Sequence, residues 1–391
     1  IPIKIKKTYY QSIYGPTLKS KTGMYAIRTP ALYEIRALEQ WWRMNKAKNF
    51  TEFYNILKMK ALPGYNIGYA DKNDTIFYIS NGLIPKRTKG YNWGEIVPGN
   101  TRNTLWTETY DIKDLPQVIQ PKSGYIYNAN HTPFRSSDSL DNPKKTDFSK
   151  DMGFETYDNN RSTRLKNLID QYDKISYADF KKIKYDRKYP KPYAFSWMNI
   201  NHLDLINPDA YPEVKNLIIA LQRWDRKADS NSIGAGIFAV FYDQLRPYYR
   251  SLPKSKIFPP ATIIKALKAT KAYLLKYFNS KEIQLGTYQK LVRGLKELPI
   301  FGLPDVITAM ASRPYKDGKV KVVSGESYIE LVKFTKNGPE IESIISFGSS
   351  DNPESLHYGD QMELYSQFKT KKMTLNKDTV YATAKKIYHP Q

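Results

Sequence analysis

Apolar and polar residues alternate with two different periods along the chain, and these periods predict its helices and strands. Period-two patterns rich in β-branched and aromatic residues predict strands at 6–13, 24–28, 65–70, 75–80, 327–334 and 341–347. Helical spacing predicts helices at 31–45, 50–59 and 377–387 and a short helix that begins at 358 or 360 and ends at 368, and it dominates residues 160–278. Because strands and helices show no regular βαβ alternation and no internal repeat, the order predicts an α+β fold built in layers.

The predicted strands and helices are unevenly distributed, which suggests a domain organisation. With 391 residues, the chain is long enough for two or three domain-sized units, or for one large layered domain with an insertion. We expect residues 1–150 and 320–391 to form the layered core. We expect residues 151–319 to form a mainly helical insertion.

A short segment between Pro121 and Phe134 carries the most informative polar residues. The residues 125–127 (Tyr-Ile-Tyr) favour a strand, bounded by Ser123-Gly124 and Thr132-Pro133. If the strand continues, Asn128 and Asn130 share one face, since side chains two apart on a strand point the same way.

Two interpretations of Asn128 and Asn130 remain open at this stage. Asparagine amides often bond to nearby main chain at the ends of strands, which would make both residues structural. Alternatively, an uncharged carboxamide with two N–H donors suits the stabilisation of a negative oxygen that forms during acyl transfer.

Composition narrows the classes of protein that remain. The formal charge is +23, but the lysines are dispersed and no nucleic-acid-binding motif accompanies them, so we expect a solvated basic surface. Hydrophobic residues make up 41% of the chain, and no apolar run approaches the ~18 residues of a membrane span. The absence of cysteine excludes disulfides and thiolate nucleophiles within these residues.

Common catalytic motifs are missing from the chain. It has no phosphate-binding glycine loop, no dinucleotide-binding glycine motif and no Gly-x-Ser-x-Gly elbow. Its four histidines are far apart and show no metal-ligand spacing. We therefore interpret His131 and His357 as packed or surface side chains.

Eight short segments form an ordered set along nearly the whole chain: 31–38 with 45–49, 66–71, 82–87, 97–99, 115–118 with 121–133, 153–156 with Asn160-Arg161, 221–225 and 357–364. Together they resemble the penicillin acylase group of N-terminal nucleophile hydrolases, which includes penicillin, cephalosporin and acyl-homoserine-lactone acylases. The resemblance implies a four-layer αββα core and hydrolysis of an amide between an acyl group and a polar amine, such as a β-lactam nucleus or homoserine lactone. It also implies export to the periplasm or the exterior.

The resemblance further implies which residues take part in the chemistry. The family nucleophile is a serine at the amino terminus of the large subunit, whose own α-amino group acts as the base. Ile1 cannot take this role, so we expect this nucleophile, part of the large subunit and the small subunit to lie outside the chain.

Three residues match family positions. Asn130 matches the oxyanion-hole asparagine, and Arg161 matches an arginine that orients it, although a plain surface arginine is the alternative. Asp141 lies where one carboxylate ligand of a structural calcium ion is expected. His131 departs from the family pattern, in which a second asparagine often follows the first.

A function from another class also fits the sequence. A noncatalytic or degenerate relative of the same fold would use the basic surface to bind an anionic ligand. The basic surface thus favours binding of an anionic ligand, whereas the matched site residues favour amide hydrolysis.

Overall fold

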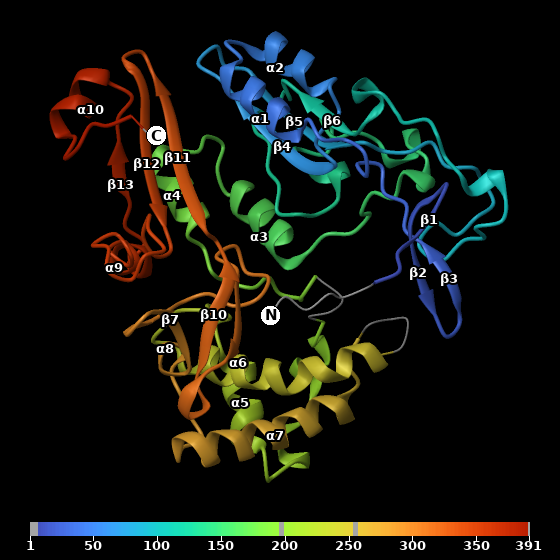
Figure 1. Cartoon of the computed structure of the whole chain (residues 1–391). Helices are drawn as coiled ribbons and strands as arrows, with labels where there is room; N and C mark the ends of the chain where they lie inside the picture. Colours follow the sequence, from blue (N-terminus) through green and yellow to red (C-terminus); the bar gives the residue numbers. More distant parts are fainter. Residues whose placement is uncertain (1–6, 195–198, 253–256, 390–391) are drawn as a thin grey trace, which may run out of the picture. The chain divides into compact units, whose positions relative to one another are not determined.

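The computed structural model describes residues 7–194, 199–252 and 257–389. The chain divides into two compact units, an N-terminal unit (Ile1–Tyr157) and a C-terminal unit (Asp158–Gln391). Figure 1 shows their elements in chain order. Ile1 and residue 6, the start of the first predicted strand, lie outside the described residues. The grouping of 320–391 with 1–150 in one core stays a prediction.

The N-terminal unit contains two three-stranded sheets and two helices. The first sheet comprises β1 (Tyr10–Ser12), β2 (Gly15–Ser20) and β3 (Gly23–Ala26). The second comprises β4 (Gly64–Ala70), β5 (Ile76–Gly82) and β6 (Gln117–Ile119), all antiparallel, and α1 (Ala37–Lys46) and α2 (Phe50–Leu57) precede it. Met44, Phe53 and Leu57 from the helices share a buried core with Phe77 and Ile79 of β5. The predicted helix at 50–59 and the predicted hairpin are therefore confirmed, whereas the helix predicted over 31–45 begins only at Ala37.

One predicted strand of this unit is wrong. Residues 125–127 form no strand, because their main chain bonds within a local loop. The amide of Tyr127 donates to the carbonyl of Ser136 at 2.8 Å, and the hydroxyl of Ser137 donates to the carbonyl of Tyr125 at 2.8 Å. Local hydrogen bonds of this kind pair the backbone N–H and C=O groups, so no neighbouring strand is needed.

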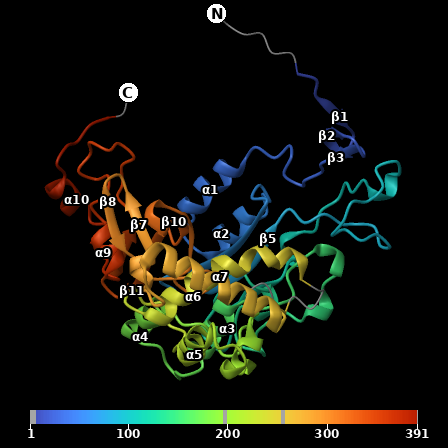
Figure 2. The same cartoon turned by 90° about the horizontal axis from the view of Figure 1, so that it is seen from below.

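The C-terminal unit begins with helices. These are α3 (Asn160–Ile169), α4 (Tyr177–Lys184), α5 (Lys215–Arg223), α6 (Ile233–Leu245), α7 (Pro260–Phe278) and α8 (Leu285–Tyr288). Figure 2 shows α6 and α7 side by side, and α6 is buried over most of its length. A Cβ on Gly236 would lie 2.0 Å from the carbonyl oxygen of Ile283, so glycine allows the close approach of α6 to this segment.

Two sheets complete the C-terminal unit. One has the order β8-β7-β10-β9, formed by β7 (Gln289–Arg293), β8 (Lys296–Pro299), β9 (Met310–Pro314) and β10 (Val320–Gly325). The other has the order β11-β12-β13, formed by β11 (Tyr328–Thr335), β12 (Gly338–Ile345) and β13 (Lys371–Met373). The helices α9 (Met362–Ser366) and α10 (Lys377–Thr383) lie before and after β13 in the chain. The Asn337-Gly338 hairpin is confirmed, whereas periodicity does not predict the sheet containing β7–β10.

Short 3₁₀ helices connect many of these elements: η1 (Arg102–Thr104), η2 (Ile112–Asp114), η3 (Pro133–Arg135), η4 (Lys145–Asp147), η5 (Lys150–Met152), η7 (Asn201–Leu205), η8 (Pro208–Ala210), η9 (Arg246–Ser251) and η10 (Lys316–Gly318). The chain is thus a mixed α+β protein, as predicted. In residues 7–194, 199–252 and 257–389, no helix has both the length and the apolar character needed to cross a membrane.

The C-terminal unit contains a partly buried carboxylate whose effect on stability depends on pH. Asp243 on α6 accepts a hydrogen bond from the hydroxyl of Tyr288 at 2.8 Å, and burial raises the pKa of Asp243 above its ordinary value. The folded state therefore holds this proton more tightly than the unfolded state, and the resulting stability is lost as pH rises through the folded-state pKa.

We expect wild-type protein to gain unfolding free energy relative to Asp243→Asn as pH falls from 7 towards the ordinary aspartate pKa of about 4. The reason is that the variant has no proton to bind at this position. Urea unfolding followed across this range measures the difference. A difference that is constant with pH, or that moves in favour of the variant at low pH, contradicts the prediction.

Candidate active site

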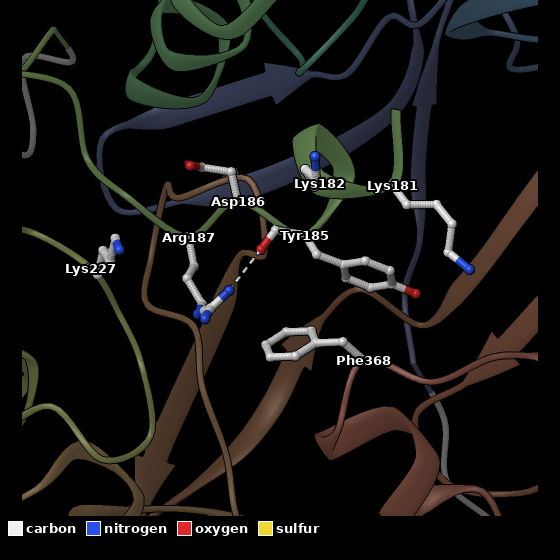
Figure 3. Close-up of a pocket in the computed structure, with 7 residues that line it drawn as sticks. All are labelled: Lys181, Lys182, Tyr185, Asp186, Arg187, Lys227 and Phe368. Carbon is white, nitrogen blue, oxygen red and sulfur yellow. Dashed lines mark hydrogen bonds between the residues drawn. The ribbon is translucent and has the colours of Figure 1, made fainter. Parts of the chain in front are cut away.

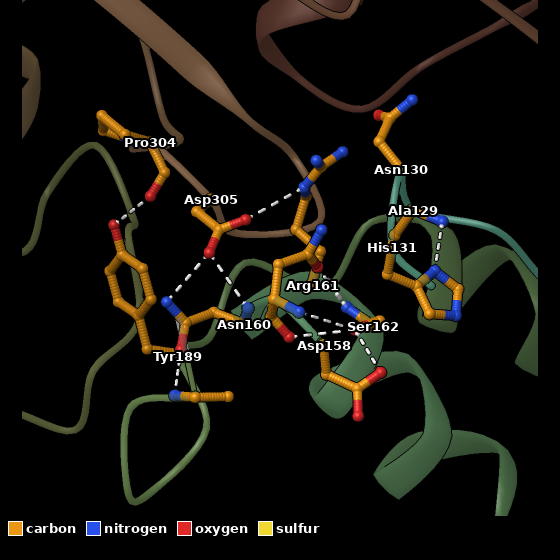
Figure 4. A network of polar contacts seen from close by, with 12 residues as sticks. Ala129, Asn130, His131, Asp158, Asn160, Arg161, Ser162, Tyr189, Pro304 and Asp305 are labelled. Carbon is orange, nitrogen blue, oxygen red and sulfur yellow. Dashed lines mark hydrogen bonds and ion pairs between the residues drawn. The ribbon is translucent and has the colours of Figure 1, made fainter. Parts of the chain in front are cut away.

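Asn130 occupies a tight turn in the left-handed backbone region, with φ of 54°. The amide of Asn130 donates to Oδ1 of Asn128 at 2.9 Å, and the amide of Ala129 donates to Nδ1 of His131 at 3.1 Å. Asparagine adopts this backbone conformation more readily than most residues. The turn leaves Asn130 exposed while Ala129 and His131 are buried. Figure 4 shows its carboxamide directed away from the His131 imidazole.

His131 is a buried side chain that holds this turn through both of its ring nitrogens. Its side chain is packed, with 1% of the residue exposed, and it stacks on Tyr127 with ring centroids 5.0 Å apart. Since Nδ1 accepts the Ala129 amide, Nε2 carries the hydrogen and donates to the carbonyl of Arg135 at 2.9 Å. The interpretation of His131 as a packed imidazole is confirmed. His357 is a half-exposed side chain whose Nδ1 lies 2.8 Å from Oδ2 of Asp360.

Asn128 links the turn to the sheet that contains β4 and β5. Its Nδ2 donates to the hydroxyl of Tyr78 at 3.4 Å, and that hydroxyl donates to Oδ1 of Asn66 at 2.7 Å. Tyr78 is 1% exposed, and burial raises its pKa to about 12, so it stays a neutral donor at physiological pH. On the other side of the turn, the amide of Thr132 donates to the carbonyl of Tyr157 at 3.3 Å. The turn is therefore held at both ends.

The two asparagines thus have different roles, and the prediction that they share a strand face is wrong. The side chain of Asn128 bonds to the main chain of the turn and to Tyr78. Asn128 is therefore a structural residue, as the first of the two interpretations holds. Asn130 instead presents its carboxamide outward from a braced position. The main chain at Asn130 is held by these bonds, and an outward carboxamide at such a position offers an N–H donor that can stabilise an oxyanion.

Arg161 lies in the first turn of α3, in the C-terminal unit. Asn159 caps this helix, with its side chain accepting the Ser162 amide at 2.8 Å and the Ser162 hydroxyl accepting the Asn159 amide at 3.0 Å. Nε of Arg161 donates to Oδ1 of Asp305 at 3.2 Å, and the Arg161 side chain is 25% exposed. Arg161 belongs to the C-terminal unit and Asn130 to the N-terminal unit.

Asp141 holds a loop of the N-terminal unit together. Its Oδ1 accepts the amide of Lys122 at 3.0 Å and its Oδ2 accepts the amide of Ser123 at 2.9 Å. Both bonds lower the pKa of Asp141, and the bond from Ser123 has the larger effect. Within the described parts of the chain, no three acidic, histidine or cysteine side chains gather as a metal centre would require. The donors in these residues do not by themselves fit a calcium site, and the calcium ligand role of Asp141 stays a prediction.

A pocket of about 430 Å³ in the C-terminal unit bears on the anion-binding alternative (Figure 3). Its lining residues are Lys181, Lys182, Tyr185, Asp186, Arg187, Lys227 and Phe368. Three of the positively charged side chains already form ion pairs with carboxylates. The pairs are Lys181 with Glu342, Lys182 with Asp179, and Arg187 with Asp229. Because these charges are largely compensated, the pocket gives no specific support to anion binding.

Comparison with known proteins places the chain in a family. Residues 3–382 match the family described as Penicillin amidase. The chain belongs to this family. Since the match covers nearly all of the sequence, the resemblance inferred from the eight short segments is confirmed.

Individual members of the family show how distant the relatives are. The chain is 23% identical over 427 residues to acyl-homoserine lactone acylase PvdQ of Pseudomonas savastanoi pv. phaseolicola (strain 1448A / Race 6), covering 93% of this chain and 52% of that protein. It is 34% identical over 130 residues to penicillin G acylase of Escherichia coli, covering 32% of this chain and 15% of that protein. The chain spans about half the length of PvdQ.

A solved structure shows the same fold. The thermostable penicillin G acylase from Alcaligenes faecalis superposes with a TM-score of 0.63 at 16% sequence identity, covering 98% of this chain and 79% of that one. The mixed α+β architecture described above is therefore that of the penicillin acylase fold.

Two hydrogen-bond partners of the residues described above were not anticipated from the sequence. Tyr78 sits in a predicted strand, where a buried aromatic residue is ordinary, and no pattern marks its hydroxyl as a link to Asn128. Asp305 follows Pro304, a pair that signals a turn but gives no indication of a partner 144 residues earlier.

Proposed function

We propose that this chain is part of an amide hydrolase and supplies its side-chain oxyanion donor, Asn130. The observation that carries the proposal is the left-handed turn, whose main chain is held by hydrogen bonds on both sides of Asn130 and which leaves Asn130 exposed. The proposed substrate is an amide that joins an acyl group to a polar amine. Membership of the penicillin amidase family supports this reaction class.

The proposed reaction follows from the chemistry of amides. A serine hydroxyl, assigned by resemblance to an amino terminus outside these 391 residues, adds to the carbonyl carbon, and its proton passes to the serine α-amino group. The carbonyl oxygen becomes negative, and the Asn130 N–H group stabilises it at that moment. The C–N bond then breaks, and the amine leaves with the proton. Water finally releases the acid from the acyl-serine.

Arg161 takes an orienting role in the proposal. Its planar guanidinium carries five N–H donors in a fixed geometry, which suits it to hold an amide oxygen or the amine end of a nucleophile. A cation in the first turn of a helix is also disfavoured by the helix dipole. Its position at the start of α3 is therefore not explained by helix stability.

The names of relatives and the family resemblance, rather than the structure of this chain, support our proposals for the substrate and the subunit composition. The names of the relatives suggest two substrate classes, N-acyl homoserine lactones and penicillin-type β-lactam amides. We also propose a complete four-layer αββα core with a small subunit, and an exported location. From the family resemblance alone we propose Asp141 as one ligand of a structural calcium ion, and no step above depends on it.

Assay of the full-length protein encoded by the natural gene tests this function. The substrates are phenylacetyl p-nitroanilide and N-decanoyl homoserine lactone, with the free acid and free amine quantified by mass spectrometry. We expect equal amounts of acid and amine to be released from at least one of them. A folded protein that releases neither product, yet binds heparin in a salt-dependent manner, would contradict hydrolysis and favour the anion-binding alternative.

A further inference from the structure

The carboxylate of Asp305 makes three hydrogen bonds at the start of α3. Oδ1 accepts from Nε of Arg161 at 3.2 Å, while Oδ2 accepts from the amide of Asn160 at 3.0 Å and from its Nδ2 at 2.9 Å. The Asp305 side chain is only 4% exposed. Figure 4 shows the carboxylate between the Asn160 and Arg161 side chains, with the terminal guanidinium nitrogens of Arg161 directed away from it.

The loop around Asp305 holds the carboxylate in place. Asp305 has φ of 62°, a backbone conformation that residues other than glycine adopt only at an energetic cost. The neighbouring residues Leu303 and Val306 are each 1% exposed in the core. The buried hydroxyl of Tyr189 donates to the carbonyl of Pro304, directly before Asp305. Several independent contacts therefore maintain a strained backbone at this residue.

From this geometry we propose that Asp305 is a positioning residue for amide hydrolysis and acts by holding the Arg161 guanidinium in one orientation. The inference rests on the function proposed above. Bonding at Nε fixes the plane of the guanidinium group, and Asn160 fixes the carboxylate in turn. Asp305 also supplies the negative charge that offsets an arginine placed at a helix amino terminus.

The energetics support a specific role for this carboxylate. Burial is the largest influence on the pKa of Asp305 and raises it, against the opposing effects of Asn160 and Arg161. A buried carboxylate costs stability unless its partners compensate. An uncharged residue would connect the loop to α3 at a lower desolvation cost, so the charge is best explained by its partner Arg161.

The alternative is that Asp305 only joins the loop to α3, and the same helix offers a matched control. One turn further along α3, Arg164 donates from Nε and Nη2 to the two oxygens of Asp186 at 3.0 and 2.7 Å. This pair is also partly buried, with 20% and 15% of its side chains exposed. It makes the same kind of connection, and no part of the proposed reaction uses it.

The experiment compares Asp305→Asn with Asp186→Asn in the full-length protein. We expect Asp305→Asn to lower kcat roughly 100-fold, as displacement of a reacting geometry by about 1 Å does, with KM changed much less. Asp186→Asn should lose thermal stability without loss of kcat. In an Arg161→Met background, Asp305→Asn should lower kcat no further, because the two residues act as one unit.

The possible outcomes separate this inference from the proposed function. An active wild type with an unchanged kcat in Asp305→Asn overturns the positioning role alone, as does an additive effect in the Arg161→Met background. A wild type without turnover overturns both proposals. Should Asp305→Asn not fold, Asp305→Glu keeps the charge and shifts the carboxylate by one methylene. A kcat equal to wild type in that variant overturns the positioning role.

Discussion

Asn130→Gly is expected to lower kcat for amide hydrolysis by roughly 10²–10³-fold, which corresponds to about 3–4 kcal/mol of transition-state stabilisation. Glycine adopts the left-handed conformation of residue 130 without strain, so the variant removes the carboxamide and leaves the turn intact. The loss should fall on kcat more than on KM, because the donor acts on charge that develops after the substrate has bound. Steady-state kinetics on the most active substrate measure both constants.

Asp74→Gly is the matched control for this substitution. Asp74 is also exposed, has φ of 60°, and lies in the hairpin between β4 and β5 of the same unit. Both variants replace a residue in the left-handed region by glycine, so their effects on stability should be similar. A kcat for Asn130→Gly within a few-fold of the Asp74→Gly value would remove Asn130 from the oxyanion role.

Phe238→Ala is expected to lower the unfolding free energy of the C-terminal unit by about 3–5 kcal/mol. Phe238 on α6 is 1% exposed and lies at the centre of an aromatic cluster. The centroid of its ring lies 4.9 Å from that of Trp224 and 5.4 Å from that of Tyr189. Removing the ring leaves a cavity that these rigid neighbours fill poorly. Hydrogen exchange of the α6 and α7 amides measures the opening of this region.

The same substitution should also weaken the candidate site through Tyr189. Tyr189 packs against Phe238 and bonds to Pro304, so its displacement loosens the turn that carries Asp305. Phe238→Leu keeps most of the volume and should cost less than about 1.5 kcal/mol. Phe334→Ala, at a side chain that is 44% exposed, should cost less than Phe238→Ala. Equal losses from Phe238→Ala and Phe334→Ala would show that the aromatic cluster does not hold this core together.

Local sequence patterns predicted the elements whose stabilising contacts are themselves local. The amphipathic pattern before residue 60 predicted α1 and α2, and Asn337-Gly338 predicted the hairpin of β11 and β12. The ordered set of family segments also brought Asn130 and Arg161 forward as candidates before any coordinate was known. In each case the signal is a residue type at a short, regular spacing, which physical propensity or family resemblance can read directly.

Tertiary structure decided what depends on distant partners. Tyr125-Ile126-Tyr127 has strand propensity, yet its main chain bonds to Ser136 and Ser137 in the same loop. The strand β10 pairs with β7, some thirty residues earlier, and such pairing leaves little mark on either segment.

The contacts that hold the candidate residues also depend on tertiary structure. Asn130 is presented outward because His131 and Asn128 bond around it, and Arg161 meets Asp305 because an aromatic core brings the loop to α3. The sequence alone brought Asn130 and Arg161 forward as candidates for the chemistry. Only the packing of remote segments decided which of them are fixed in position, because burial and hydrogen bonding act between atoms that are close in space rather than along the chain.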